Sequence, residues 1–120
     1  MLIGGSGADV ITGGLGSDLL SGGADADRFD YNALGDGIDT ITDFTRGAAG
    51  DVIDLRDVLV GYNGAAGSFV RSVAAADGAT LAVNADGVGN DFVPMVNLRG
   101  IAATATLVDE LVAQGNLLLA

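Results

Sequence analysis

Cysteine, histidine, tryptophan and lysine are absent from this 120-residue sequence, and proline occurs once. Without cysteine the chain has no disulfide, no thiolate metal site and no cysteine nucleophile. Without histidine it lacks the commonest general base and the usual ligand of transition metals. The ligands that remain are hard oxygen atoms, which suit Ca²⁺ or Mg²⁺.

Basic residues are scarce as well: five arginines stand against sixteen acidic residues, which gives a net charge of −11. Nucleic acids and anionic membrane surfaces are poor partners for such a chain, because phosphate contacts need clustered Lys and Arg. Divalent cations are the natural counter-charge. The longest apolar run is also far shorter than the roughly 20 residues that span a bilayer. We therefore expect neither nucleic-acid binding nor membrane insertion.

Aromatic residues are few, four Phe and two Tyr, whereas glycine occurs twenty times. Glycine loses more backbone freedom on folding than any other residue, so this number requires a structural reason. A catalytic cleft for sugars would need more aromatic residues, and we expect no enzyme, although the spacing of the carboxylates alone does not exclude a glycosidase pair. The length fits a single domain with a modest core.

A nine-residue repeat accounts for many of the glycines. Its three copies are residues 4–12 (GGSGADVIT), 13–21 (GGLGSDLLS) and 22–30 (GGADADRFD). Glycine recurs at the first two places, aspartate at the sixth and a large apolar residue at the eighth. The third copy has Asp25 in place of glycine at its fourth position, where a left-handed turn is tolerated better by Asp than by most residues.

The repeat predicts a turn followed by a short strand. The residues GGxGxD form a tight turn that directs carbonyl oxygens toward one point, and the next three form a strand whose central side chain points inward. Two repeats make one coil, so Asp9 and Asp27 stack and are placed to share a cation. Asp18 would need a partner 18 residues later, at Asp36. Such short strands bury too little apolar surface alone, so the ions supply part of the folding energy.

The pattern resembles the calcium-binding nonapeptide of RTX proteins. The resemblance implies an all-β fold: a short parallel β-roll or β-solenoid with calcium-binding turns, continuing into a β-sandwich-like C-terminal part with one short helix. We expect about two to five Ca²⁺ ions. The alternatives are a flexible Gly/Asp-rich linker and a β-solenoid without metal. The candidate ligands in the turns are Gly5, Gly7, Asp9, Gly14, Gly16, Asp18, Gly23, Asp25 and Asp27.

Residues 35–55 (GDGIDTITDFTRGAAGDVIDL) lose the nine-residue period and alternate instead. They resemble the D-x-I-x-D-F…G-D-x-I-D-L stretch that closes the calcium repeats of serralysin-type and other RTX proteins. By that resemblance Asp36, Asp39 and Asp43 are further calcium ligands, while Asp51 is either a ligand or a turn residue. Asp54 and Asp57 are expected on a solvated face. The positions expected to be buried are Ile38, Ile41, Phe44, Val52, Ile53 and Leu55.

Two strands are expected further along, over residues 79–85 and 92–98, joined by a turn at 86–91. Proline removes a backbone donor, so Pro94 favours either an edge position for the second strand or a strand that begins near the proline.

One short helix is expected over residues 107–114, because apolar residues there share one face. Thr106–Asp109 forms a variant of the capping box, and Gly115 would stop the helix. The repeats with their closing strands (1–57) and the C-terminal part (58–120) are expected to form one continuous domain.

The segment VNLRGI, the short helix and the apolar residues LLLA together resemble the C-terminal region of proteins exported by type I secretion systems. In that family the uncleaved C-terminus is the export signal. The resemblance therefore implies a partner, the ABC transporter complex of the secretion machinery. It also implies a protein that is secreted from, or held on the surface of, a Gram-negative bacterium. We expect the chain to be a monomer.

Taken together, the residues and the resemblances predict a calcium-dependent folding module that carries the export signal of an RTX adhesin. In a calcium-poor cytoplasm the acidic residues repel one another and the chain stays unfolded, whereas calcium outside the cell folds it. Two alternatives remain open: a surface-binding module for carbohydrate, cells or ice, and the non-catalytic tail of a secreted exoenzyme.

Overall fold

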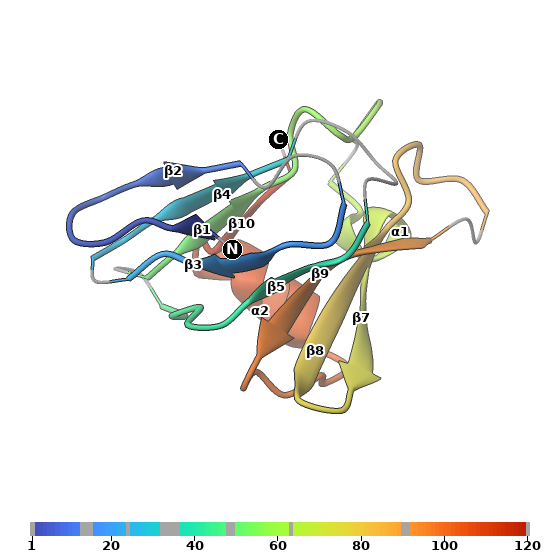
Figure 1. Ribbon diagram of the computed structural model, residues 1–120. Coiled ribbons are helices and arrows are strands. Elements are labelled where there is room, and N and C mark those ends of the chain that lie inside the picture. Colours follow the sequence, from blue (N-terminus) through green and yellow to red (C-terminus); the bar gives the residue numbers. More distant parts are fainter. Residues whose placement is uncertain are drawn as a thin grey trace.

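The computed structural model of the chain describes residues 2–12, 16–23, 25–31, 37–47, 50–62, 64–89 and 92–119. This part of the chain contains ten strands and two helices (Figure 1). The strands are β1 (Leu2–Ile3), β2 (Val10–Ile11), β3 (Leu19–Ser21), β4 (Arg28–Asp30), β5 (Asp39–Ile41), β6 (Val52–Asp54), β7 (Val70–Ala75), β8 (Gly78–Val83), β9 (Val93–Arg99) and β10 (Leu117–Leu118). The helices are α1 (Ala66–Phe69) and α2 (Leu107–Ala113).

The first six strands alternate between two sheets. β1, β3 and β5 pair in parallel in one sheet, and β2, β4 and β6 pair in parallel in the other. Each glycine-rich turn carries the chain from one sheet to the other, so that strands from every second repeat become neighbours. Leu2 thus pairs with Leu20, and Val10 pairs with Arg28. Figure 1 shows β2 and β4 above β1 and β3, with the turns at the ends of the strands.

The C-terminal half extends the same two sheets. β9 pairs in parallel with β5, and β8 and β7 follow in antiparallel pairs, which gives the six-stranded order β1-β3-β5-β9-β8-β7. β10 pairs in parallel with β6 and completes the four-stranded order β10-β6-β4-β2. Helix α2 contacts β7, β10 and α1. The segments before and after residue 57 therefore share both sheets.

This architecture shows that the expected fold class is wrong. The chain is neither an all-β roll or solenoid nor one that passes into a β-sandwich. In its described part it is a mixed α/β fold with one mixed sheet, one parallel sheet and two helices. The nine-residue period predicts only the short parallel strands near the N-terminus. It carries no information on residues 70–99, which add antiparallel strands to the same sheet, or on α2, which buries Leu107 and Leu111 in the common core.

The C-terminal strands and helix predicted from the sequence are present, but some of their details differ. The strands expected over residues 79–85 and 92–98 are confirmed as β8 and β9, and the expected helix is confirmed as α2. Strand β7 and helix α1 were not predicted. β9 lies inside its sheet, between β5 and β8, and not at an edge. It begins one residue before Pro94, which faces Ala82 where the register of β8 and β9 shifts, so an irregular position accommodates the missing amide.

The expected capping box at the start of α2 does not form. Thr106 makes no side-chain hydrogen bond to the backbone of the first turn. Its hydroxyl donates instead to the Glu110 carboxylate, which also binds Arg46 at 3.0 Å. Gly115 follows the helix with a φ of 80°, a left-handed conformation that ends helices at low cost to glycine.

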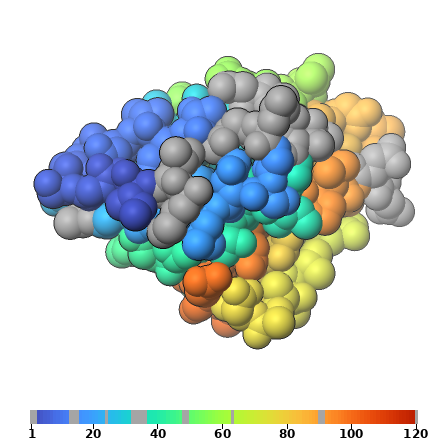
Figure 2. Space-filling model, viewed as in Figure 1, coloured from blue at the N-terminus to red at the C-terminus, as the bar shows by residue number. Residues whose placement is uncertain are grey.

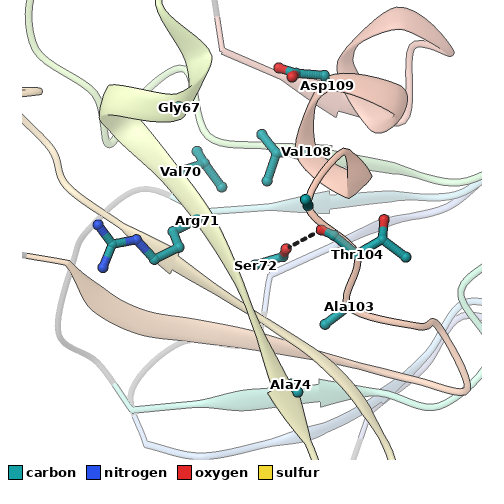
Figure 3. A pocket seen from close by; sticks show the side chains of 10 residues that line it. Gly67, Val70, Arg71, Ser72, Ala74, Ala103, Thr104, Val108 and Asp109 are labelled. Carbon is teal, nitrogen blue, oxygen red and sulfur yellow. Dashed lines mark hydrogen bonds between the residues drawn. The ribbon is translucent and has the colours of Figure 1, made fainter.

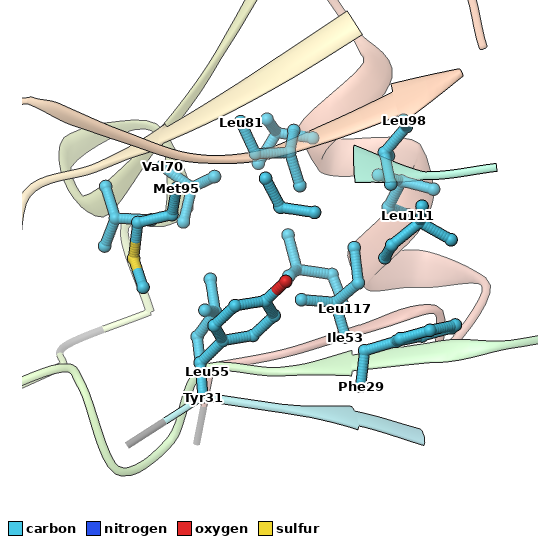
Figure 4. Packing of buried hydrophobic residues seen from close by; sticks show 14 of the residues in the cluster. Phe29, Tyr31, Ile53, Leu55, Val70, Leu81, Met95, Leu98, Leu111 and Leu117 are labelled. Atoms are coloured by element: carbon cyan, nitrogen blue, oxygen red, sulfur yellow. The ribbon is translucent and has the colours of Figure 1, made fainter. Parts of the chain in front are cut away.

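The core lies between the two sheets and is closed by α2 (Figure 4). The apolar residue at the eighth place of each repeat, Ile11, Leu20 or Phe29, is buried as the repeat predicts. Ile38, by contrast, is 42% exposed, and Val52 is only half-buried. Both were expected in the core. β5 begins at Asp39 and alternates inward at Asp39 and Ile41, which turns Ile38 outward.

The molecule measures 39 × 29 × 28 Å along its principal axes. In Figure 2 the N-terminal strands (blue) form one end, and the β7–β8 hairpin (yellow) lies at the lower right. No helix in the described ranges is long and apolar enough to cross a bilayer.

Candidate metal centre

Three aspartates stack at the start of β2, β4 and β6. The Asp9 amide donates a hydrogen bond to Asp27 Oδ1 at 2.9 Å, and the Asp27 amide donates to Asp51 Oδ1 at 2.9 Å. The carboxylates of Asp27 and Asp51 therefore each bind the backbone of the preceding layer. We call this arrangement the Asp9–Asp27–Asp51 ladder. Asp51, which the sequence left open as ligand or turn residue, is its third member.

A second pair of stacked aspartates lies at the start of β3 and β5, in the other sheet. The Asp18 amide donates to Asp39 Oδ1 at 2.9 Å, and we call these residues the Asp18–Asp39 pair. The residues lie 21 positions apart, in place of the 18 that one coil of two repeats would give. The expected partner, Asp36, lies outside the described residues, as does Gly14.

Several carboxylate oxygens in these stacks are buried without a hydrogen-bond partner. In the part of the chain that the structure describes, they are Asp9 Oδ2, Asp18 Oδ2 and Asp27 Oδ2. Asp27 is 2% exposed and Asp39 is 4% exposed. Leaving a buried charged group unpaired is costly, because water no longer solvates it. Among the described residues, the stacks therefore have no counter-charge.

The pKa values of two stacked carboxyls reflect this environment. Burial raises the pKa of Asp27, and the negative charges of Asp51 and Asp9 raise it further, against the hydrogen bond from the Asp9 amide. Burial likewise raises the pKa of Asp39, and the charge of Asp18 adds to the effect. Both carboxyls thus sit where a positive charge would be favoured.

The first glycine of a repeat makes room for the aspartate of the same repeat. A Cβ on Gly22 would lie 2.3 Å from Asp27 Oδ2, and a Cβ on Gly4 would lie 2.6 Å from Asp9 Oδ2. Neither distance is compatible with a side chain. The spacing of Gly at the first place and Asp at the sixth is therefore a packing requirement.

The second glycine lets adjacent turns approach each other. Gly5 and Gly23 have φ values of 87° and 82°, and a Cβ on Gly23 would lie 2.3 Å from the Gly5 carbonyl oxygen. Gly7 and Gly16 also have positive φ. Asp25, which replaces glycine at the fourth place of the third repeat, adopts the same left-handed conformation at φ 69°. Its carboxylate accepts a hydrogen bond from the Gly7 amide at 2.9 Å.

Asp43, expected as a calcium ligand, uses both oxygens to hold a turn. Oδ2 accepts from the Ser21 hydroxyl at 2.8 Å and from the Gly23 amide at 2.9 Å, while Oδ1 accepts from the Gly22 amide at 3.1 Å. Burial acts to raise the pKa of Asp43, but these hydrogen bonds outweigh it and the pKa is lowered. Asp43 therefore anchors the start of the third repeat.

Asp54 does not lie on a solvated face as expected. It is 4% exposed and forms a two-pronged ion pair with Arg56, at 2.9 Å to Nε and 2.7 Å to Nη2. The hydrogen bond from Arg56 is the main reason that the pKa of Asp54 is lowered. Asp57 is exposed, as expected.

A buried asparagine joins the C-terminal segment to the ladder. Asn116 Nδ2 donates to the Asp51 carbonyl at 2.7 Å and to the Gly47 carbonyl at 2.9 Å, and Asn116 Oδ1 accepts from the Gly47 amide at 2.8 Å. Asn116 is 1% exposed. The residues that follow it pair with β6. Nothing in the sequence around Asn116 indicated this role.

The side chains alone do not complete a metal site. No three Asp or Glu side chains converge on one point in the described ranges. A cation beside Asp9 and Asp27 would therefore also need carbonyl oxygens of the glycine-rich turns. Carboxylate and carbonyl oxygens are the ligands that Ca²⁺ prefers, so the donor set fits this ion.

A shallow groove of about 400 Å³ lies elsewhere, beside β7 (Figure 3). Its walls are mostly small residues, and Ser72 Oγ donates to the Thr104 carbonyl across it at 3.1 Å. Asp109 is the single carboxylate among the described residues that line it.

Comparison with known proteins adds no relative. No family model, no curated protein and no solved structure matches the chain. The resemblance to RTX proteins therefore depends on the repeat and its neighbouring motifs.

Proposed function

We propose that this chain is a calcium-dependent folding module of an RTX-type protein exported by type I secretion. The observation that carries the proposal is the Asp9–Asp27–Asp51 ladder, in which buried carboxylate oxygens have no partner among the described residues. Repeated glycines make room for these oxygens. Successive repeats keep these buried carboxylates despite the cost of burying their charge. A bound cation that neutralises the charge is the best explanation.

Asp9 and Asp27, with carbonyl oxygens of the turns at Gly5, Gly7 and Gly23, are the groups that would hold the ion. Bound calcium would neutralise the carboxylates and link adjacent turns. One site at 100 times its dissociation constant adds about 2.7 kcal/mol to stability. Strands of two or three residues form few backbone hydrogen bonds of their own, so a contribution of this size decides whether the coils fold.

Export is the second part of the proposal. In the calcium-poor cytoplasm the net charge of −11 and the twenty glycines favour an unfolded chain, which suits passage through an ABC transporter complex. Outside the cell, calcium folds the coils, and residues 107–119 pack onto them through Leu107, Leu111 and Leu117. The same segment then serves as export signal when unfolded and as part of the core when folded.

Calorimetric titration of Ca²⁺ into Asp27→Asn and Asp57→Asn tests the calcium site. Asn keeps an oxygen that can accept from the Asp9 amide but removes the charge. We expect Asp27→Asn to lose at least one ion or to bind calcium at least tenfold more weakly. Asp57→Asn, at an exposed position, should titrate like the unaltered chain. Equal calcium binding by both variants would reject the ladder as the site.

Deletion tests the export signal. A passenger protein fused to the chain should be exported by a type I system, and removal of residues 107–120 should abolish export. The matched control is deletion of the β7–β8 hairpin, residues 70–83, which should lower stability outside the cell but leave export intact. Export that persists without residues 107–120 would reject this part of the proposal.

A further inference from the structure

Strand β7 forms the one long open edge of the two sheets in the part of the chain that the structure describes. The other terminal strands, β1, β2 and β10, are each two residues long, whereas β7 has six. It pairs with β8 in one unbroken register and contains neither a bulge nor a proline. Proteins usually protect such an edge with a bulge, a proline, a lysine or a covering segment, so the open side of β7 requires an explanation.

Free backbone groups of β7 face this open side. Opposite residues in an antiparallel pair alternate between those that exchange backbone hydrogen bonds and those that do not. The Asn84 amide donates to the Phe69 carbonyl at 2.7 Å, and the alternation from that pair onward directs the amides and carbonyls of Ser72 and Ala74 away from β8. In the described ranges, no backbone hydrogen bond from outside the sheet reaches them. These groups are therefore available to pair with another strand.

The groove beside β7 runs along this edge (Figure 3). From the strand, Ser72 and Ala74 line it, and Ala74 is exposed. The opposite wall consists mostly of small residues that precede or begin α2, namely Ala103, Thr104, Ala105 and Val108. Because these side chains are short, they leave room beside the free backbone groups. The shape of the groove therefore favours an extended segment with small side chains.

Asp109, in the same groove, is a charge without a partner. It is exposed and has neither a hydrogen bond nor an ion pair with the described residues. The five arginines of the chain are engaged elsewhere: Arg28, Arg46, Arg56 and Arg99 lie within 4 Å of other carboxylates, and Arg71 lies 4.2 Å from the centre of the Phe92 ring. A cation that pairs with Asp109 would therefore come from a partner. A second copy of the chain fits poorly, because it would bring a further net charge of −11 to this edge.

We propose that the open edge of β7 and its groove bind an extended, cationic peptide segment of another protein as an additional strand. The peptide backbone would pair with Ser72 and Ala74, and a lysine or arginine would reach Asp109. Main-chain hydrogen bonds give such an added strand its affinity, and alternate side chains give it specificity. The site lies at the opposite end of the six-stranded sheet from β1 and includes none of the stacked aspartates. It therefore adds a binding surface to the proposed folding module.

Fluorescence anisotropy with a fluorescein-labelled peptide of sequence TATKTAT, measured at saturating Ca²⁺, tests the proposal. In this peptide, threonines alternate with small residues and with the lysine that would face Asp109. We expect saturable binding to the unaltered chain and weaker binding of the peptide TATETAT, whose glutamate would repel Asp109. Absence of saturable binding at millimolar concentrations, or equal binding of the two peptides, overturns the inference.

Two variants separate the backbone from the charge. Ala74→Pro removes an amide on the open side that does not donate to β8, so the variant should fold and bind TATKTAT about tenfold more weakly. Ala74→Ser keeps the amide and should bind like the unaltered chain. Asp109→Asn removes the charge and should weaken binding about two- to fivefold, while the exposed Asp57→Asn should not.

Circular dichroism establishes that each variant folds, and Asp109→Asn decides the question if Ala74→Pro does not. Unchanged binding by folded Ala74→Pro, or by Asp109→Asn, overturns the inference. Sedimentation of the unaltered chain covers the remaining occupant of the edge. A monomer agrees with the inference, whereas a dimer that Ala74→Pro dissociates would show that a second copy covers β7 and would overturn it.

Discussion

Gly22→Ala is the substitution with the clearest expected cost. The new Cβ would lie 2.3 Å from Asp27 Oδ2 and 2.8 Å from Asp27 Cγ, well inside contact distance. Asp27 cannot move away easily, because it is 2% exposed and its Oδ1 accepts from the Asp9 amide at 2.9 Å. Overpacking of this kind costs about 1–3 kcal/mol. The loss of freedom in the unfolded chain opposes this by about 0.4–1 kcal/mol, so a net loss of up to about 2.6 kcal/mol remains.

Gly67→Ala is the matched control for this prediction. Gly67 lies in α1, has no positive φ, and a Cβ there would meet no atom within 4 Å. Alanine at this position should leave the stability unchanged or raise it by up to about 1 kcal/mol. Thermal unfolding at saturating Ca²⁺ measures both variants, and at about 4 °C per kcal/mol the two melting temperatures should differ by several degrees. Equal melting temperatures would refute the packing role of Gly22 against Asp27.

Two further predictions concern the polar contacts. Asn116→Ala leaves the carbonyls of Gly47 and Asp51 without their buried donor, and we expect the free energy of unfolding, measured with denaturant, to fall by about 2–4 kcal/mol. Gln114→Ala, at an exposed position nearby, is the control, and equal stability of the two variants would contradict this prediction. Folding raises the pKa values of Asp27 and Asp39, so in EDTA their protonation stabilises the folded chain fully at a pH below 3.8, their ordinary pKa. This stabilisation is lost as the pH rises through the pKa values of the folded chain. The folded fraction, measured by circular dichroism, should therefore fall as the pH rises from about 4, and it should fall less steeply in Asp27→Asn. If the folded fraction of Asp27→Asn fell as steeply as that of the unaltered chain, this would argue against a buried, charged Asp27.

The local part of the fold could be predicted because it repeats. The eighth-place residues Leu20 and Phe29 are buried, and Asp9 stacks on Asp27, since the period of nine fixes which residues face inward and which coils are neighbours. The overall fold class could not be predicted in the same way. It depends on pairing between β5 and β9 and between β6 and β10, and no local pattern specifies which distant strand completes a sheet.

The candidate site shows the same limit. The Asp18 amide bonds to Asp39, 21 positions later, whereas a strict period of 18 points to Asp36, which lies outside the described residues. Asn116 contacts Gly47 across 69 positions of sequence. These roles follow from tertiary packing, which composition and spacing do not encode.

Circular dichroism of the chain in EDTA, followed by titration with Ca²⁺ to millimolar concentrations, tests the central claim most directly. The account predicts a largely unfolded spectrum without the ion and a cooperative gain of ordered structure as calcium is added. The stacked aspartates then have the positive charge that their burial requires. An identical, ordered spectrum under both conditions would contradict it.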